Sequence, residues 1–184
     1  MMKSNRQGDI MKKVIVFVFL FLFAGCGYTT RGFVYETNKI TISPIVNKIN
    51  IATQDRSGSD YASYPVLLEK RLTNNLINAF NIDGSLKIVN SSYDAMKLVC
   101  EVTDYRKTAV MHSDNDDVQE QKLKLAVNIK LYDKNDVLIK TRVINGEAEH
   151  YLTGAKSTSE SAAQNDLLDD TSRRILEAVV DAWQ

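Results

Sequence analysis

The chain has 184 residues, which is enough for one domain with a sizeable core but leaves little room for a second. Apolar residues make up 44% and charged residues 25% of the sequence, as in an ordinary globular protein. The formal net charge is zero, so composition gives no reason to expect a nucleic-acid partner.

The first 25 residues have the features of a lipoprotein signal peptide. A pair of lysines precedes an uncharged apolar run over residues 14–24. A helix of that length spans about 16 Å, which is about half of the hydrocarbon thickness and too short to cross a bilayer stably. Ala24 and Gly25 then precede Cys26, in an order that resembles a lipobox. We expect cleavage before Cys26 and lipidation of that cysteine, which would hold the chain on a membrane.

Three further residues bear on this export signal. Phe23 replaces the leucine usual at the third position before the cysteine, and a plain signal peptide with an incidental cysteine remains the alternative. Met11 could be the true start, because residues 1–10 add nothing that a signal peptide needs. Gly27 stands where some bacteria place an aspartate that retains lipoproteins in the inner membrane, so passage to the outer membrane is expected.

The predicted organisation has three parts. Residues 1–25 form the signal peptide, residues 26–36 form a lipidated N-terminus and tether, and residues 37–184 form a single α+β domain. Cys100 is the only other cysteine, so lipidation of Cys26 would leave no intramolecular disulfide, and the core must stabilise the domain.

One strand and one helix are expected in the first part of the domain. Residues 39–46 alternate apolar and polar side chains as a strand does, and Pro44 suggests an edge position or a bulge. A polar loop over residues 50–62 follows. The helix should begin near Pro65 and end at Asp83-Gly84. Its apolar stripe consists of Leu68, Leu72, Leu76 and Phe80.

Four strands then follow one another. They are predicted over residues 86–89, 96–112, 122–132 and 137–151. Turn-forming residues at 113–117 and 133–136 separate the last three into hairpins. The residues expected to face the core are Met96, Leu98, Cys100 and Val102 in one strand and Leu123, Leu125, Val127, Ile129 and Leu131 in the next.

A second amphipathic helix ends the chain. It should start at the capping box Ser157–Glu160, and its stripe consists of Leu168, Ile175, Leu176, Val179 and Trp183. The element order is therefore β-α-β-β-β-β-α, and four adjacent strands favour an antiparallel meander. Both helices must bury their stripes on one face of that sheet. The predicted fold is a two-layer α+β sandwich with one polar sheet face left uncovered.

The sequence contains no convincing catalytic or metal-binding constellation. His112 and His150 are interpreted as solvated surface histidines, and Cys100 as a core thiol. An acidic group at one hairpin tip lacks the glycine and ligand spacing of a calcium loop. It consists of Asp114, Asp116, Asp117 and Glu120. No glycine-rich phosphate loop occurs, so we expect neither an enzyme nor a bound cofactor or metal.

One group of basic residues remains as a candidate site. Lys122, Lys124 and Lys130 share the outer face of one strand, and pairing of Lys130 with Lys140 would add Lys140 and Arg142 to it. Like charges opposite one another destabilise a sheet. The arrangement is tolerable where the face meets an anion such as a phosphorylated glycolipid. The alternative is a solvated face dotted with lysines.

In its order of motifs the chain resembles the LPS-assembly lipoprotein family LptE. The matching segments are Cys26-Gly-Tyr with Arg31-Gly32, Ile42–Asn47, Leu68–Leu76, Leu98–Tyr105, Ile129–Asp133 and the closing helix. The resemblance implies two helices on one side of a mostly antiparallel sheet. It also implies a non-catalytic subunit that sits as a plug and assembly aid inside an LptD-like outer-membrane β-barrel and contacts lipopolysaccharide through basic residues.

Two functional hypotheses follow from these observations. In the first, a lipid-anchored outer-membrane lipoprotein aids lipopolysaccharide insertion at the cell surface, with its domain on the periplasmic side or within a barrel lumen. In the second, a periplasmic lipoprotein module docks on another envelope protein such as a cell-wall synthase. The partner distinguishes them, and the sequence does not display it.

Overall fold

The structure is a computed structural model that describes residues 37–49, 64–91, 93–112 and 118–181. The predicted signal peptide, Cys26, the tether, the 50–62 loop, the 113–117 tip and Trp183 lie outside these described residues. In the described ranges, neither helix is long and apolar enough to cross a membrane.

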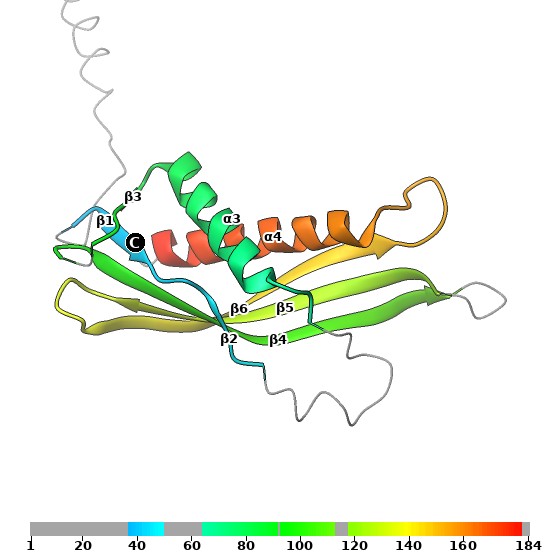
Figure 1. The fold of residues 1–184 in the computed structure, drawn as a ribbon, viewed down its shortest axis with the longest axis horizontal. Helices are drawn as coiled ribbons and strands as arrows, with labels where there is room; N and C mark the ends of the chain where they lie inside the picture. Colours follow the sequence, from blue (N-terminus) through cyan, green and yellow to red (C-terminus); the bar gives the residue numbers. More distant parts are fainter. Residues whose placement is uncertain (1–36, 50–63, 92, 113–117, 182–184) are drawn as a thin grey trace, which may run out of the picture. The chain divides into compact units, whose positions relative to one another are not determined.

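Two helices lie on the same side of one sheet (Figure 1). The elements in chain order are β1 (Lys39–Ile42), β2 (Val46–Asn47), α3 (Leu68–Asp83), β3 (Lys87–Ile88), β4 (Met96–His112), β5 (Val118–Tyr132), β6 (Leu138–Tyr151) and α4 (Glu160–Val180). The predicted α+β class, with both helices on one face of a mostly antiparallel sheet, is confirmed.

The sheet is mixed rather than a simple meander. Its strand order is β3-β1-β4-β5-β6, with β2 also beside β4. The strands β4, β5 and β6 form the expected antiparallel hairpins. The prediction placed β3 next to β4, but β1 lies between them and is parallel to both. Parallel pairing of β1 and β3 is possible because α3 carries the chain back across the sheet between them.

Pro44 divides the predicted strand 39–46 into two. Residues 43–45 separate β1 from β2, and β1 has a strand on each side rather than lying at an edge. The Ile45 amide bonds the Thr73 hydroxyl of α3, at 3.1 Å, instead of a neighbouring strand. Proline cannot donate a ladder hydrogen bond, so the chain leaves the sheet at this point and rejoins it at β2.

The first helix buries the predicted stripe. Leu68, Leu72, Leu76 and Phe80 are all fully buried. Gly84 has φ of 67° and its amide bonds the Phe80 carbonyl, so the predicted stop is confirmed. The start differs from the prediction: Leu67 has φ of 58°, and the regular helix begins at Leu68, after the turn that contains Pro65.

The N-cap of the second helix lies two residues after the predicted one. Ser159, not Ser157, is the N-cap, and its hydroxyl accepts a hydrogen bond from the Ala162 amide at 3.1 Å. The preceding Thr158 amide bonds the Tyr151 carbonyl of β6, at 3.0 Å, which keeps residue 158 outside the helix. Leu168, Ile175 and Val179 of the predicted stripe are buried, and Leu176 is partly buried.

The core lies between this helix pair and one face of the sheet. All predicted core residues of β4 and β5 are buried, which confirms the faces assigned to both strands. At β6 the helix α4 approaches the backbone closely. A Cβ atom on Gly146 would lie 1.9 Å from the Thr171 hydroxyl oxygen, so only glycine fits there.

Candidate functional site

The sheet face away from the helices carries Lys122, Lys124 and Lys130, as predicted. These side chains alternate with the buried core residues of β5 and are partly exposed. We call these three residues the lysine face. The residues of β6 opposite them are Glu149, Glu147 and Thr141, respectively.

Each lysine of the lysine face has a carboxylate partner. The Lys122 and Lys124 ammonium groups lie 2.6 Å and 3.4 Å from the two carboxylate oxygens of Glu147. Lys130 lies 3.3 Å from Glu101 of β4. The hydrogen bond from Lys122 lowers the pKa of Glu147. The carboxylates offset the repulsion between neighbouring lysines, which explains how the sheet tolerates them.

Lys140 and Arg142 are not part of the lysine face, which corrects the prediction. Lys130 is opposite Thr141, whereas Lys140 is opposite the buried Leu131. Both Lys140 and Arg142 therefore lie on the helix-covered side, and the Lys140 ammonium group donates to the Ala178 carbonyl of α4 at 3.1 Å. An irregularity after Leu131 shifts the register, and a shift of one residue moves every side chain to the other face.

The histidines differ from one another. His112 is exposed, as predicted, but His150 is only 4% exposed, so its prediction as a solvated residue is wrong. Its Nε2 atom lies 3.1 Å from the Thr158 carbonyl oxygen. The 152–159 segment folds back beside β6 and covers the ring, a contact that the sequence pattern does not reveal.

Cys100 is the buried core thiol that the sequence predicts. Burial raises its pKa to about 12, so it is protonated at neutral pH and unsuited to nucleophilic attack. Among the described residues, no cluster of three or more histidine, cysteine or acidic side chains could hold a metal ion. Glu120 lies in β5, while its three acidic companions at the hairpin tip fall outside the described ranges.

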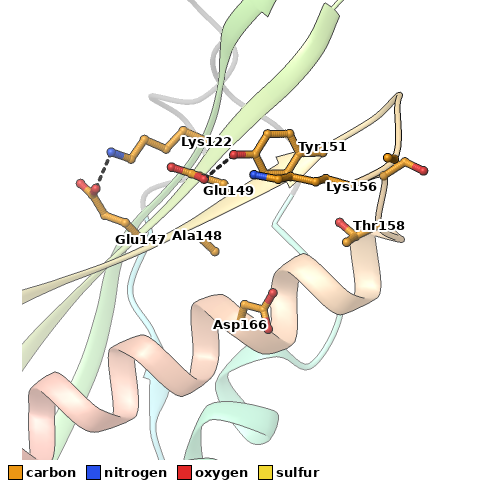
Figure 2. Close-up of a pocket in the computed structure, with 10 residues that line it drawn as sticks. Lys122, Glu147, Ala148, Glu149, Tyr151, Lys156, Thr158 and Asp166 are labelled. Atoms are coloured by element: carbon orange, nitrogen blue, oxygen red, sulfur yellow. Dashed lines mark hydrogen bonds and ion pairs between the residues drawn. The ribbon is translucent and has the colours of Figure 1, made fainter.

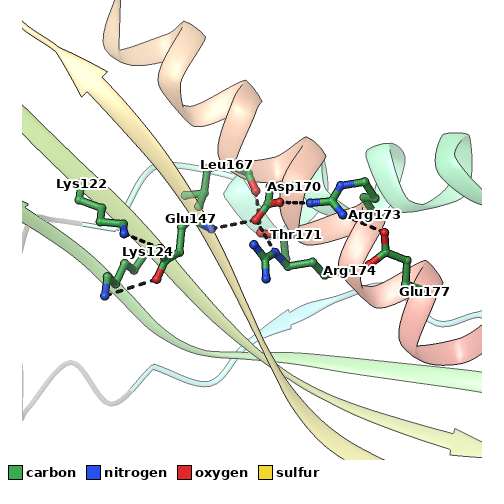
Figure 3. A network of polar contacts seen from close by, with 9 residues as sticks. All are labelled: Lys122, Lys124, Glu147, Leu167, Asp170, Thr171, Arg173, Arg174 and Glu177. Carbon is green, nitrogen blue, oxygen red and sulfur yellow. Dashed lines mark hydrogen bonds and ion pairs between the residues drawn. The ribbon is translucent and has the colours of Figure 1, made fainter. Parts of the chain in front are cut away.

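A polar network joins the lysine face to α4 (Figure 3). The Glu147 amide donates to the Asp170 carboxylate at 3.1 Å, and the same carboxylate pairs with Arg174 at 2.7 Å and with Arg173. Burial alone would raise the pKa of Asp170. The hydrogen bonds from the amide and the arginines outweigh burial, so that pKa lies below its ordinary value.

Asp170→Asn should reduce stability at neutral pH by about 2 kcal/mol, because the carboxylate accepts charge-assisted hydrogen bonds. A carboxylate with a depressed folded pKa contributes stability above its unfolded pKa, about 3.9, and loses it as the pH falls through the folded value. The difference in unfolding free energy between wild type and variant should therefore become smaller as the pH falls from about 5 to about 2. Urea unfolding across that range measures it. Asp166→Asn, on the same helix, is the control, and a gap independent of pH would contradict the prediction.

A cleft of about 730 Å³ lies at the end of β6 (Figure 2). One wall carries Lys122, Glu147, Glu149 and Tyr151, and the other carries Lys156, Thr158 and Asp166. The Tyr151 hydroxyl donates to Glu149 at 2.7 Å, and the Lys156 ammonium lies 5.6 Å from the centre of the Tyr151 ring. Sequence reasoning missed this cleft because it depends on how the 152–158 loop folds back.

Comparison with solved structures relates this fold to bacterial lipoproteins. An uncharacterized lipoprotein B from Nitrosomonas europaea has 16% identity and a TM-score of 0.53, over 83% of this chain and 90% of that one. The rare lipoprotein B from Shewanella oneidensis has 11% identity and a TM-score of 0.47, over 77% and 94% of the two chains. At these identities the likeness concerns the fold alone.

Sequence comparison identifies the family. No curated protein matches the chain. The family described as LptE, lipopolysaccharide-assembly, matches residues 46–183, which is most of the chain and nearly all of the described fold. The chain therefore belongs to the LptE family of lipopolysaccharide-assembly proteins.

Proposed function

We propose that the protein is a lipid-anchored outer-membrane lipoprotein that acts as a non-catalytic plug and assembly subunit of a lipopolysaccharide translocon. Its partner would be an LptD-like β-barrel, and its task would be to aid lipopolysaccharide insertion at the cell surface. The match to the LptE family over residues 46–183 carries this proposal. The lipobox-like segment before Cys26 supplies the anchor.

The uncovered side of the sheet supports a binding role for the lysine face. The helices cover the opposite side, and no other described element covers this one (Figure 1). The surface is polar and its charged groups form ion pairs with one another. Such a surface is suited to contact with the polar lumen of a barrel. An incoming phosphate would compete with Glu147 and Glu101 for the lysines, so we expect ligand contact here to depend on salt concentration.

Affinity purification from detergent-solubilised outer membranes tests the proposed partner. A tagged full-length chain should retain an outer-membrane barrel protein in a stable complex. Recovery of a cell-wall synthase in place of a barrel would instead support the second hypothesis and overturn this one.

Cys26→Ala should abolish incorporation of labelled fatty acid and release the protein from membranes, because the acyl chains would have no attachment point. Fractionation of cells grown with labelled palmitate measures both effects. Cys100→Ala is the matched control and should label like wild type. Labelling of the Cys26→Ala protein would contradict the proposed anchor.

Replacement of Lys122, Lys124 and Lys130 by glutamine should weaken binding of purified lipopolysaccharide and raise outer-membrane permeability. Glutamine removes the charge without adding carboxylates beside Glu147. The free energy of unfolding should therefore fall by no more than about 1 kcal/mol per ion pair. Binding at two salt concentrations and drug sensitivity in cells are the measurements.

The matched control for this triple variant is Lys140→Gln with Arg142→Gln. Both residues are basic and close in sequence but lie on the helix-covered side. Two results would show that the lysine face is a solvated surface and not a binding site. Either the folded triple variant binds lipopolysaccharide and maintains the outer-membrane barrier like wild type, or the control pair has an equal effect.

A further inference from the structure

The strand β6 ends the sheet on one side, and part of its outer edge is open. No strand pairs with β6 other than β5 in the part of the chain that the structure describes. An edge strand presents unpaired amides and carbonyls to any extended chain that reaches it. Whether such a chain can reach β6 depends on what already occupies its edge.

Two contacts fix which backbone groups point outward. The Glu147 amide bonds Asp170 of α4, and the Tyr151 carbonyl accepts from the Thr158 amide, so both residues direct their backbone groups away from β5. Neighbouring residues of an antiparallel strand alternate in this direction, so Glu149 between them also points outward. Within the described residues, the Glu149 amide and carbonyl have no hydrogen-bond partner.

The cleft shown in Figure 2 lies along this open stretch of edge. Its walls come from β6 on one side and from the 155–158 loop and α4 on the other. A groove between an edge strand and a helix is the arrangement in which peptide-binding domains add a strand to a sheet. The volume of about 730 Å³ is sufficient for a short extended segment.

The charges of the cleft indicate the kind of segment that fits. The lining includes three carboxylates, those of Glu147, Glu149 and Asp166, and two ammonium groups, those of Lys122 and Lys156. Glu147 is engaged by lysines, but Asp166 has no ion-pair partner among the described residues. Lys122 and Lys124 balance Glu147, so the cleft charges without an ion-pair partner among the described residues are Glu149 and Asp166 against Lys156. This excess of one negative charge favours a segment that carries a basic side chain.

We propose that this cleft binds an extended, basic segment of a partner polypeptide, which adds as a strand to the outer edge of β6 through the Glu149 backbone. Asp170 closes the edge at the Glu147 amide, and Thr158 closes it at the Tyr151 carbonyl, so the added strand is short. The site lies beside the lysine face and shares Lys122 with it, but it does not depend on the proposed role in lipopolysaccharide assembly.

A synthetic peptide of alternating threonine and valine with a central lysine is the probe, tested on the full-length chain in detergent. Its binding should slow hydrogen exchange at the Glu149 and Tyr151 amides. The same peptide with N-methylated backbone amides should not bind, because it cannot form the strand ladder. Replacing the lysine with norleucine should weaken binding to wild type but not to the Asp166→Asn variant.

Two variants separate backbone from side-chain contributions. Glu149→Pro removes the outward amide and Glu149→Ala retains it, while both lack the carboxylate. The proline variant should bind the peptide about tenfold more weakly than the alanine variant, as expected for one lost hydrogen bond. Absence of peptide binding, equal binding by the N-methylated peptide, or protection at a site other than β6 would overturn the proposal. The N-methylated peptide decides the matter on wild-type protein if Glu149→Pro does not fold.

Discussion

Leu125→Asp should abolish cooperative folding of the domain. Leu125 is 1% exposed in the centre of β5, opposite Gly146 of β6 and Tyr105 of β4. An aspartate there would be charged and without a partner, which costs more than about 4 kcal/mol beyond the lost apolar burial. Because a domain is stable by only about 5–15 kcal/mol, most of that margin would be lost. Thermal unfolding followed by circular dichroism measures the effect.

Lys124→Asp is the matched control for this substitution. The neighbouring position points to the opposite side of the sheet, and its side chain is about half exposed. The same new carboxylate should there cost only about 1 kcal/mol, through loss of the pair with Glu147 and some repulsion. Similar losses of thermal stability in the two variants would mean that the register of β5 is wrong.

Gly146→Ala should also be strongly destabilising, although it adds one methyl group. The new Cβ would lie 1.9 Å from the Thr171 hydroxyl oxygen and 3.1 Å from the Thr171 Cα, so α4 and β6 would have to move apart. Overpacking of this kind costs about 1–3 kcal/mol. The shift should also weaken the hydrogen bond from the Glu147 amide to Asp170, since it joins the same two elements. Chemical denaturation measures the free-energy change.

A second substitution tests whether this contact is the cause. Thr171→Ala removes the hydroxyl but leaves its Cβ 2.9 Å from the new one, so the double variant should recover only part of the lost stability. A double-mutant cycle gives the coupling energy. Strict additivity of the two substitutions would show that Gly146 is required for some other reason.

The sequence by itself determined most of the elements and the buried side of α3, β4 and β5. Period-two alternation in β4 and β5, and four-residue spacing in α3, identified core residues that the structure confirms. These patterns are local, because alternation and helical spacing follow from the backbone geometry of each element alone. The same local chemistry identified Gly84 as the end of α3.

Features that join distant parts of the chain were decided only by the tertiary structure. The insertion of β1 between β3 and β4 depends on the path of α3, and the burial of His150 depends on the return of the loop before α4. The placement of Lys140 and Arg142 depended on a single irregularity in the pairing of β5 with β6. The spacing of residues does not specify strand register. One extra residue in one strand makes every side chain beyond it point to the opposite face of the sheet. For that reason the sequence determined three lysines of the candidate face, whereas the tertiary structure decided where that face ends, which carboxylates neutralise it and where the edge of β6 remains open.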